Sequence, residues 1–540
     1  MEHRTQYWIF GPLEDAAFVL LTPLPILLAF TTARGTGTMN ILIAFGLALA
    51  MAHYFPGILR AYGDRALFKR YRIRLVLAPL FLITLTSYFA YRNLHIVLLL
   101  ALLWGQWHWM MQIYGFARIY DAKARPMART PALLDRMICL LWFGMCAFVV
   151  NNDLPSYVAS FYQSGGPHLP AEAFAWFTRA WVVLTAGVTV VYVIHMWTTI
   201  RSGQWPNPLK FVFIGVTFIY LSHTAGVVER PYMGMIMFES WHDIQYLAIV
   251  WLFNLSRARN NPEAGSFIRF MFRPRALLVL AYVVLCLAFG SLTHAWRFFD
   301  NAIAARVALS FVTSMGLLHY YLDGFIWKIR EPETRRALLD EASQSVSTAV
   351  TAAVPRLPVL RHAVLWLLFA IPAVLFFVKE SSGDAARPMQ VYEDVLLGFP
   401  DSADAHYQLA RELQDAGRFR EATAHFEDAL KFKPNMLPAH IFAGVLLTDR
   451  KEFAAAKLHF EQALRLDPRN AEVHNDLGIV LDEGGDLQGA KTHLERAVRF
   501  DPEYALAHNN LAGVLTRLGD SSGAAKHFKQ ANRLDPEHFH

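Results

Sequence analysis

The chain has 540 residues, of which 55% are hydrophobic and only 17% are charged, and its mean hydropathy is positive. Such a composition excludes an ordinary soluble enzyme and a disordered chain. The net charge of +6 comes mainly from short basic loops between apolar blocks, so it indicates membrane topology and no nucleic-acid partner. The three cysteines, Cys139, Cys146 and Cys286, lie inside apolar blocks without a CxxC pair, so no disulfide framework or zinc–cysteine site is expected.

Apolar blocks long enough to cross a bilayer recur from about residue 16 to residue 379. We expect eleven spans, at residues 16–33, 39–56, 74–91, 94–113, 133–151, 174–197, 209–225, 233–254, 276–295, 303–327 and 363–379. The last is the weakest, because it is short and contains Pro372. The first block follows no basic n-region or small-residue cleavage site, so we expect a retained helix and not a signal peptide.

The loops between these blocks alternate between basic and poorly charged. Residues 57–74, 114–136, 255–275 and 328–361 are strongly basic. The positive-inside rule places these loops in the cytoplasm. We therefore expect an integral protein of a bacterial-type inner membrane, with a cytoplasmic N-terminus and, after eleven spans, an extracytoplasmic C-terminal domain.

The last quarter of the chain repeats itself at a step of 34 residues. The step relates Pro434, Pro468, Pro502 and Pro536, as well as Ala429, Ala463, Ala497 and Ala531. Small residues recur at Ala410, Gly444, Gly478 and Ala512, and at Ala422, Ala456, Ala490 and Ala524. Small side chains at these offsets let two antiparallel helices approach closely, and each proline ends a second helix. The pattern over about 403–538 resembles the tetratricopeptide repeat.

This resemblance implies an α-solenoid whose concave groove binds a protein or peptide partner. We predict an all-α chain with a polytopic membrane domain at 1–380, a linker and leading helix at 381–402, and four repeats at 403–540. Histidines also follow the 34-residue step, at His406, His440, His474 and His508. We interpret them as packing residues of the first helix in each repeat, because stacked repeats hold them too far apart to share one ion.

Ionisable side chains fall inside four of the expected spans, where burying charge is costly. They include a histidine on each span, and all four spans run inward in the expected topology. The candidate metal ligands are His53, His108, Gln112, Glu239, His242, Asp243, His319 and Asp323. Pairs three or four residues apart share a helix face. By contrast, His195, His223 and His294 lie near span ends, and we interpret them as packing or hydrogen-bonding residues.

The residue types predict the metal. E-x-x-H, present here as Glu239 and His242, is the ligand pattern of soluble di-iron carboxylate proteins. Mixed imidazole and carboxylate ligands suit a divalent ion, with a di-iron centre expected first and zinc or manganese as alternatives. Gln245, Tyr246, Tyr320 and Trp107 are expected around the ligands, whereas Arg60, Asp64, Arg118 and Asp121 are expected in interfacial ion pairs. A metal-free polar network that relays protons or ions stays open.

Three functions follow from these features. The first is a membrane metalloenzyme that oxidises a lipid-soluble substrate, with Glu239 and Asp243 as catalytic residues. It is loosely similar to histidine-rich membrane desaturases and hydroxylases, but it has no HxxHH box, so their ligands do not carry over. Hydrolysis with Glu239 as general base is a variant of this function. The second is a glycosyltransferase, since the layout is similar to that of membrane O-mannosyltransferases with tetratricopeptide repeats. The third is a transporter or assembly scaffold.

Overall fold

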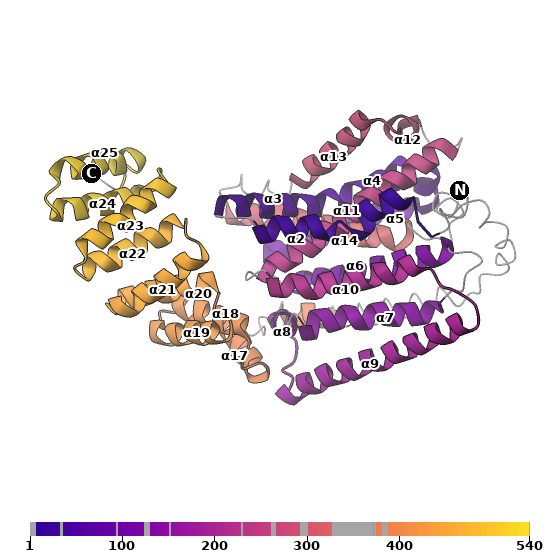
Figure 1. Ribbon diagram of the computed structural model, residues 1–540, viewed down its shortest axis with the longest axis horizontal. Coiled ribbons are helices and arrows are strands. Elements are labelled where there is room, and N and C mark those ends of the chain that lie inside the picture. The colour runs from indigo at the N-terminus through magenta and orange to yellow at the C-terminus, as the bar shows by residue number, and fades with distance from the viewer. Residues whose placement is uncertain are drawn as a thin grey trace. The chain divides into compact units, whose positions relative to one another are not determined.

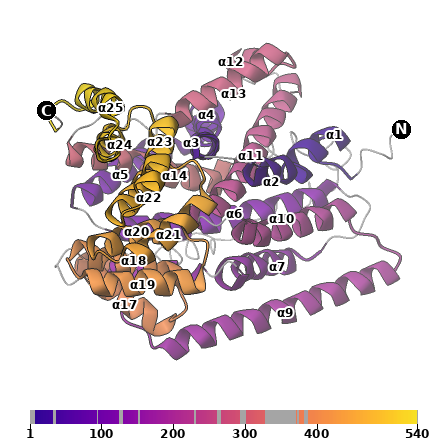
Figure 2. The same ribbon diagram turned by 60° about the vertical axis from the view of Figure 1, so that its left-hand side comes forward.

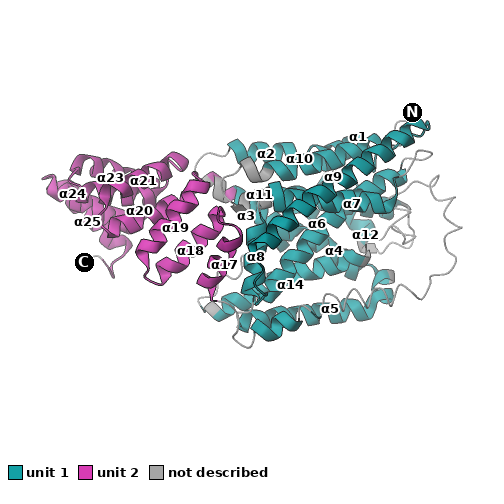
Figure 3. Cartoon of the chain, turned by 90° about the horizontal axis from the view of Figure 1, so that it is seen from below, with its two compact units in different colours: residues 1–32, 42–386 teal, residues 33–41, 387–540 magenta. Residues whose placement is uncertain are grey.

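The computed structural model describes residues 7–32, 36–92, 95–123, 130–150, 153–227, 231–260, 266–291, 301–326, 371, 374–380 and 387–538. All regular secondary structure in these ranges is helical, as expected. The chain divides into two compact units, one of residues 1–32 and 42–386 and one of residues 33–41 and 387–540 (Figure 3). Below they are called the helical unit and the repeat unit.

The helical unit contains the following helices, of which α3 has its first residues, up to Ile41, in the repeat unit. They are α1 (Pro12–Glu14), α2 (Pro23–Thr32), α3 (Thr36–Ala52), α4 (Tyr54–Gly63), α5 (Arg65–Arg92), α6 (Ile96–Lys123), α7 (Ala132–Gly144), α8 (Leu154–Gln163), α9 (Ala171–Arg201), α10 (Pro208–Val227), α11 (Pro231–Asn260), α12 (Ser266–Met271), α13 (Ala276–Ser291) and α14 (Ala302–Ile326). The segments Asp15–Leu20 and Met145–Val150 are π-helical.

The described residues contain fewer membrane-spanning candidates than the eleven expected. Six helices are long and apolar enough: Ile41–Gly63, Leu67–Arg92, Ile96–Lys123, Ala132–Val150, Ala171–Arg201 and Ile303–Gly324. A seventh is possible if Pro12–Leu20 and Pro23–Thr32, which meet at a bend of 41°, form one span. The expectation of eleven is therefore wrong for the described chain.

The difference has a physical cause in each helix. α10 and α13 form as expected, but their apolar stretches, Pro208–His223 and Ala276–Ser291, are shorter than a bilayer requires. α11 is long, but Glu239, His242 and Asp243 lower its hydropathy. The expected span 363–379 lies mostly outside the described residues. An orientation that depends on an odd number of spans therefore stays a prediction.

The outer helices expose an apolar surface that water would not favour. On α9, for example, Val183, Val191 and Ile194 are each more than half exposed. Only 11% of the most apolar window of this helix is buried, against 50% for the span Ile41–Gly63. Apolar surface of this extent is typical of a helix that faces lipid.

The inner helices bring distant parts of the sequence together. α14 packs on α4, α5 and α6, while α6 also packs on α7 and α10, and α10 packs on α11. Figures 1 and 2 both show α6, α10, α7 and α9 following one another across the unit. His53 lies between the last residue of α3, Ala52, and the first residue of α4, Tyr54.

Buried ions are paired where α6 ends and α7 and α10 begin. Lys210 is fully buried, and its Nζ lies 3.0 Å from Asp121 and 2.6 Å from Asp135. Arg118 contacts the same two carboxylates at 2.9 and 2.6 Å. The expected ion pair of Arg118 and Asp121 is thus confirmed. At another position in this unit, Asp64 pairs with Arg257 at 2.7 Å.

The repeat unit consists of one leading helix and four helix pairs. They are α17 (Pro388–Gly398), α18 (Ala403–Asp415), α19 (Phe419–Phe432), α20 (Leu437–Asp449), α21 (Phe453–Leu466), α22 (Ala471–Glu483), α23 (Leu487–Phe500), α24 (Ala505–Arg517) and α25 (Ser521–Leu534). Each second helix ends two residues before a proline of the 34-residue step, as expected. Figure 2 shows the helix pairs stacked in chain order.

Small residues at the predicted offsets allow this close packing. A Cβ atom added to Gly444 would meet the Phe460 ring at 2.7 Å, and one added to Gly478 would meet Leu494 at 2.6 Å. Ala410 and Ala512, at the same place in the other repeats, are fully buried. The helix pairs therefore approach as closely as the repeat pattern predicts.

Candidate functional site

Four histidines from four separate chain segments meet inside the helical unit. His53 lies between α3 and α4, His108 on α6, His242 on α11 and His319 on α14. Their exposed fractions range from 0 to 8%. The sequence predicted that these imidazoles occur at a similar depth, and the structure brings their rings into contact. We call these four residues the histidine cluster.

The rings of the histidine cluster are close enough to share an ion. The ring centroid of His53 lies 4.6 Å from that of His319 and 5.3 Å from that of His242. His108 lies 4.8 Å from His319 and 5.3 Å from His242 by the same measure. The Nε2 atoms of His108 and His319 are 3.3 Å apart. One ligand atom from each of His53, His108 and His242 lies within 4.8 Å of the other two.

Two carboxylates adjoin these rings. Oδ1 of Asp243 lies 2.7 Å from Nδ1 of His53, although the pair does not have hydrogen-bond geometry. Oδ2 of Asp323 lies 3.6 Å from Nε2 of His319, one helical turn away. Asp323 also accepts a hydrogen bond of 2.8 Å from the hydroxyl of Tyr246. Both acids therefore lie where the sequence placed them, beside imidazoles.

Several polar atoms of the histidine cluster and of the adjoining Asp243 have no hydrogen-bond partner among the described residues. They are both ring nitrogens of His53, Nε2 of His242, Nδ1 of His319 and both carboxylate oxygens of Asp243. Buried polar atoms without partners are costly, and native proteins rarely contain several together. Since each of these atoms is a good ligand for a divalent ion, a bound ion would remove that cost.

Aromatic rings surround the histidine cluster. Tyr54 stacks on His319 with centroids 4.8 Å apart and an interplanar angle of 24°. Tyr320 packs against His108 at 4.9 Å, and Tyr246 against His53 at 5.5 Å. Tyr246 and Tyr320 were expected here. Tyr54 was not, although it directly follows His53 in the sequence.

Gly57 lets one of these tyrosines reach the cluster. It lies one turn after His53 on α4, and a Cβ atom at this position would be 3.0 Å from the Tyr246 hydroxyl and 3.5 Å from Nδ1 of His319. The missing side chain thus makes room for the hydrogen bond between Tyr246 and Asp323.

The remaining candidate residues lie further from the rings. Gln112 points to α11, where its amide lies 3.4 Å from the His242 carbonyl and 3.4 Å from Gln245. Glu239 is half-buried and shares a helical turn with His242, but among the described residues it does not join the ligand groups within 4.8 Å. Trp107 is 49% exposed on the surface of α6, so it does not enclose the site as expected.

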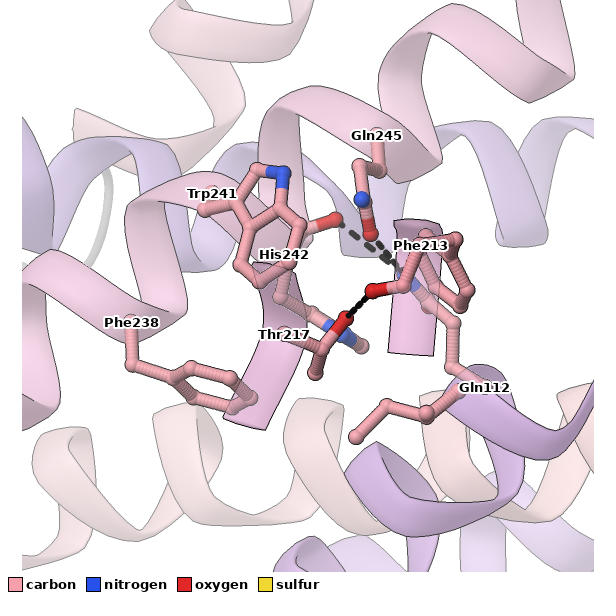
Figure 4. Close-up of a pocket in the computed structure, with 8 residues that line it drawn as sticks. Gln112, Phe213, Thr217, Phe238, Trp241, His242 and Gln245 are labelled. Atoms are coloured by element: carbon pink, nitrogen blue, oxygen red, sulfur yellow. Dashed lines mark hydrogen bonds between the residues drawn. The ribbon is translucent and has the colours of Figure 1, made fainter. Parts of the chain in front are cut away.

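A cavity adjoins the histidine cluster on the side of α10 (Figure 4). His242 belongs both to the cluster and to the cavity wall. The rest of the wall is mainly apolar and consists of Gln112, Ile113, Phe213, Thr217, Phe238, Trp241 and Gln245. The cavity has a volume of about 10 Å³, which is room for about one water molecule next to the His242 imidazole.

Comparison with known proteins identifies the repeat unit. Residues 407–471 and 447–513 match two tetratricopeptide-repeat family models. The repeat unit therefore carries tetratricopeptide repeats, as the 34-residue step predicted. No curated protein sequence matches the chain.

Two solved structures that are similar to the chain each cover about three tenths of its length. MamA 41-end from Desulfovibrio magneticus RS-1 is 24% identical, with 28% of this chain and 85% of that chain covered and a TM-score of 0.27. YrrB, described as a TPR protein with an unusual peptide-binding site, is 22% identical, with 31% and 88% covered and a TM-score of 0.27.

Proposed function

We propose that the histidine cluster binds one divalent transition-metal ion, and that the chain is a metal-dependent membrane oxidoreductase acting on a lipid-soluble substrate. The observation that carries this proposal is the meeting of four buried imidazoles from four chain segments, with several nitrogens unpartnered. Polar side chains that serve only to join two helices need no such convergence.

The separation of two imidazole nitrogens fits a pair of ligands on one ion. Two imidazole nitrogens bound to one tetrahedral ion at about 2.0–2.1 Å lie about 3.3 Å apart. The Nε2 atoms of His108 and His319 have this separation. A di-iron centre of the carboxylate type needs bridging acids between the ions. Glu239 does not lie among the imidazoles, so an imidazole-rich single-ion site replaces the di-iron expectation in this proposal.

The surrounding side chains would hold and orient the ligands. Asp243 lies against the ring of His53, while Tyr246 donates to Asp323, which faces His319. Iron, zinc and manganese suit such a mixture of imidazole and carboxylate groups. Iron would supply the redox chemistry for an oxidation. Glu239, on the same turn as His242, is then a candidate for moving a proton at the edge of the site.

The site's surroundings favour an apolar substrate. The adjoining cavity is lined mainly by apolar side chains, and α6, which forms part of its wall, is a candidate membrane span. The proposed substrate is an acyl chain, an isoprenoid or a quinone from the lipid, and the cavity, at about 10 Å³, would have to widen to admit it. In a desaturation, the substrate loses two hydrogens, dioxygen is reduced to two water molecules, and an external reductant supplies two electrons with two protons.

The tetratricopeptide repeats form a protein-interaction domain, which supports a protein or peptide partner. In this proposal the partner organises the enzyme in its membrane or delivers the reductant. The topology with an extracytoplasmic repeat unit belongs to the same proposal. A reporter enzyme fused to the C-terminus tests it, and a cytoplasmic signal would contradict it.

A proton or ion relay is the second candidate, because His108 and His319 touch through their Nε2 atoms. Such a contact passes a proton without a metal. The glycosyltransferase reading has less support. This function needs a free acidic side chain at the membrane surface. Asp15 directly precedes the first expected span, but it is buried and accepts hydrogen bonds from the backbone of Ile9 and Phe10.

Metal analysis of the untagged, detergent-purified chain tests the proposal. We expect a variant with His242→Ala and His319→Ala to hold about one equivalent less iron, zinc or manganese than the wild type. His195→Ala, which changes a histidine on α9, is the matched control and should keep the metal. A metal-free wild type, or equal metal content in the wild type and the double variant, would favour the relay and overturn the enzyme proposal.

A further inference from the structure

Every tetratricopeptide repeat contains a pair of touching histidines. The first member lies on the first helix of the repeat and the second member lies 19 residues later on the second helix. The pairs, with their Nδ1–Nδ1 distances, are His406–His425 at 2.9 Å, His440–His459 at 3.1 Å, His474–His493 at 3.0 Å and His508–His527 at 2.8 Å. The contact therefore belongs to the architecture of the repeat.

A backbone carbonyl fixes the tautomer of the first histidine in each pair. Nε2 of His406 lies 3.1 Å from the carbonyl oxygen of Pro400, and the same contact recurs at Pro434, Pro468 and Pro502. A carbonyl oxygen only accepts, so Nε2 must carry the proton. Nδ1 of the first histidine then presents a lone pair to its partner ring. This is how a backbone carbonyl orients a histidine that binds a metal.

The first repeat adds a carboxylate that the other three lack. Asp428 lies three residues after His425 on α19, and its Oδ2 lies 3.9 Å from Nδ1 of His406. The equivalent positions, one, two and three repeats later, hold Gln462, Arg496 and Gln530. In the described repeat unit, His406, His425 and Asp428 are the one set of three such side chains whose ligand atoms lie within 4.8 Å of one another.

We propose that His406, His425 and Asp428 form a binding site for a divalent ion of the zinc class in the first repeat. Two imidazole nitrogens and one carboxylate oxygen are ligands that zinc accepts, and they leave a further coordination position for water or a partner's side chain. The ligands come from both helices of the repeat, so the ion would join α18 to α19. This site is separate from the histidine cluster and does not depend on it.

The geometry requires only small movements. Ligand atoms on one tetrahedral zinc ion lie about 3.3 Å apart. The two Nδ1 atoms are slightly closer than this value, and the carboxylate oxygen is slightly farther away. His406 is buried and Asp428 is half exposed, so an ion can enter from the surface. Glu393 and Glu421 add negative charge near His425, which attracts a cation.

The other repeats make the proposal specific. Their histidine pairs have the same contact and the same carbonyl partner but no acid. In the third repeat Arg496 even places a positive charge beside His474 and His493. If two imidazoles were sufficient, all four repeats would bind the ion; if the carboxylate is required, only the first binds it.

Hydrogen exchange of the full-length, untagged chain with and without zinc tests this site locally. We expect zinc to slow exchange in α18 and α19 but not in α22 and α23. Asp428→Asn and His425→Gln should each weaken this protection by at least about 10-fold in zinc concentration. A folded apo variant is recognised by unchanged exchange in α20–α25. Protection in all repeats, no protection, or protection that survives Asp428→Asn would overturn the proposal.

Gln462→Asp is the complementary variant. It puts the missing carboxylate beside His440 and His459, whose Nδ1 atoms are 3.1 Å apart. We expect zinc to protect α20 and α21 in this variant in addition to α18 and α19. Non-specific zinc binding by histidines would not produce this second site, because the histidines of the repeat are unchanged. If the first site stays intact and no second site appears, two imidazole nitrogens and an acid are insufficient for binding.

Discussion

Asp243 lies with its Oδ1 atom 2.7 Å from Nδ1 of His53, and both side chains are fully buried. The two residues come from α11 and from the junction of α3 and α4. A carboxylate on one ring nitrogen turns the other nitrogen toward a metal and makes it more basic. From this close approach we expect Asp243 to act as a positioning residue for the histidine cluster.

Asp243→Asn should therefore weaken metal binding without abolishing it. The amide keeps the shape but loses the charge that orients His53, and loss of such a partner lowers metal affinity about 10–100-fold. Titration of the purified chain against a chelator measures the affinity. Asp153→Asn, at the start of α8, is the control and should leave it unchanged. Equal affinities in Asp243→Asn and wild type would contradict the role of Asp243.

Lys210 offers a test of stability in the helical unit. Its fully buried ammonium group neutralises Asp121 and Asp135, so Lys210→Met should leave buried negative charge behind. Breaking a buried pair in this way costs about 3–5 kcal/mol. All 14 tryptophans precede residue 387, so thermal unfolding followed by tryptophan fluorescence reports on this unit.

The matched variant for this prediction removes one charge of each sign. Lys210→Met combined with Asp135→Asn leaves Arg118 to neutralise Asp121, at 2.9 Å. We expect the double variant to unfold at a higher temperature than Lys210→Met alone. If Lys210→Met unfolds like the wild type, the ion network does not stabilise the fold.

The sequence was most informative where several independent signals agreed. Histidines at a similar depth in four spans predicted the histidine cluster, because only the bundle interior can accommodate them. The direction in which each side chain points was harder to predict from the sequence. Gln112 follows His108 by four residues, yet one turn further along α6 it reaches Gln245 and the cavity wall and not the imidazoles.

Span number and the histidine pairs show two other limits. Apolar blocks were counted by composition, but the described apolar parts of α10 and α13 are shorter than a bilayer span requires. The second histidine series, His425, His459, His493 and His527, was visible as a 34-residue step but was missed. Its meaning depends on the 19-residue spacing between two helices, which only the folded repeat brings into contact.

Lys451 occupies a turn position that favours glycine. It has a φ of 62°, whereas Gly417, Gly485 and Gly519, at the equivalent turns of the other repeats, have φ between 76 and 85°. A residue with a side chain in this left-handed region loses about 1–2 kcal/mol of folding free energy. Glycine avoids this strain, but its more flexible unfolded state offsets part of the gain. Lys451→Gly should therefore stabilise the second repeat by about 0.5–1 kcal/mol.

Hydrogen exchange of the full-length chain measures this effect in α20 and α21. Lys451→Ala is the control, because it removes the charge but keeps the Cβ atom, and it should give no gain. A gain of equal size in both variants would mean that charge, and not backbone conformation, limits the stability of this repeat.

The pair of His474 and His493 should make the third repeat sensitive to acid. Burial, followed by the neighbouring His474 and Arg496, lowers the pKa of His493 from 6.5 to about 4. Between these values the unfolded chain binds a proton that the folded repeat does not. The contribution to stability is therefore complete above pH 6.5 and is lost as the pH falls toward 4. The shift corresponds to about 3 kcal/mol, which we reduce to about 1 kcal/mol because the ring is half exposed.

Asp476 on α22 acts in the opposite direction. Burial raises its pKa from 3.8 to about 6, so the folded repeat takes up this proton more readily and gains stability as the pH falls through 6. The test must therefore compare wild type with His493→Gln, whose amide can still donate to Nδ1 of His474 but does not titrate. With zinc removed, protection of α22 and α23 against hydrogen exchange, corrected for the intrinsic rate, should fall about 5-fold more in wild type than in His493→Gln between pH 7.5 and 5. An equal fall in both proteins would show that the histidine pair keeps an ordinary pKa in the folded repeat.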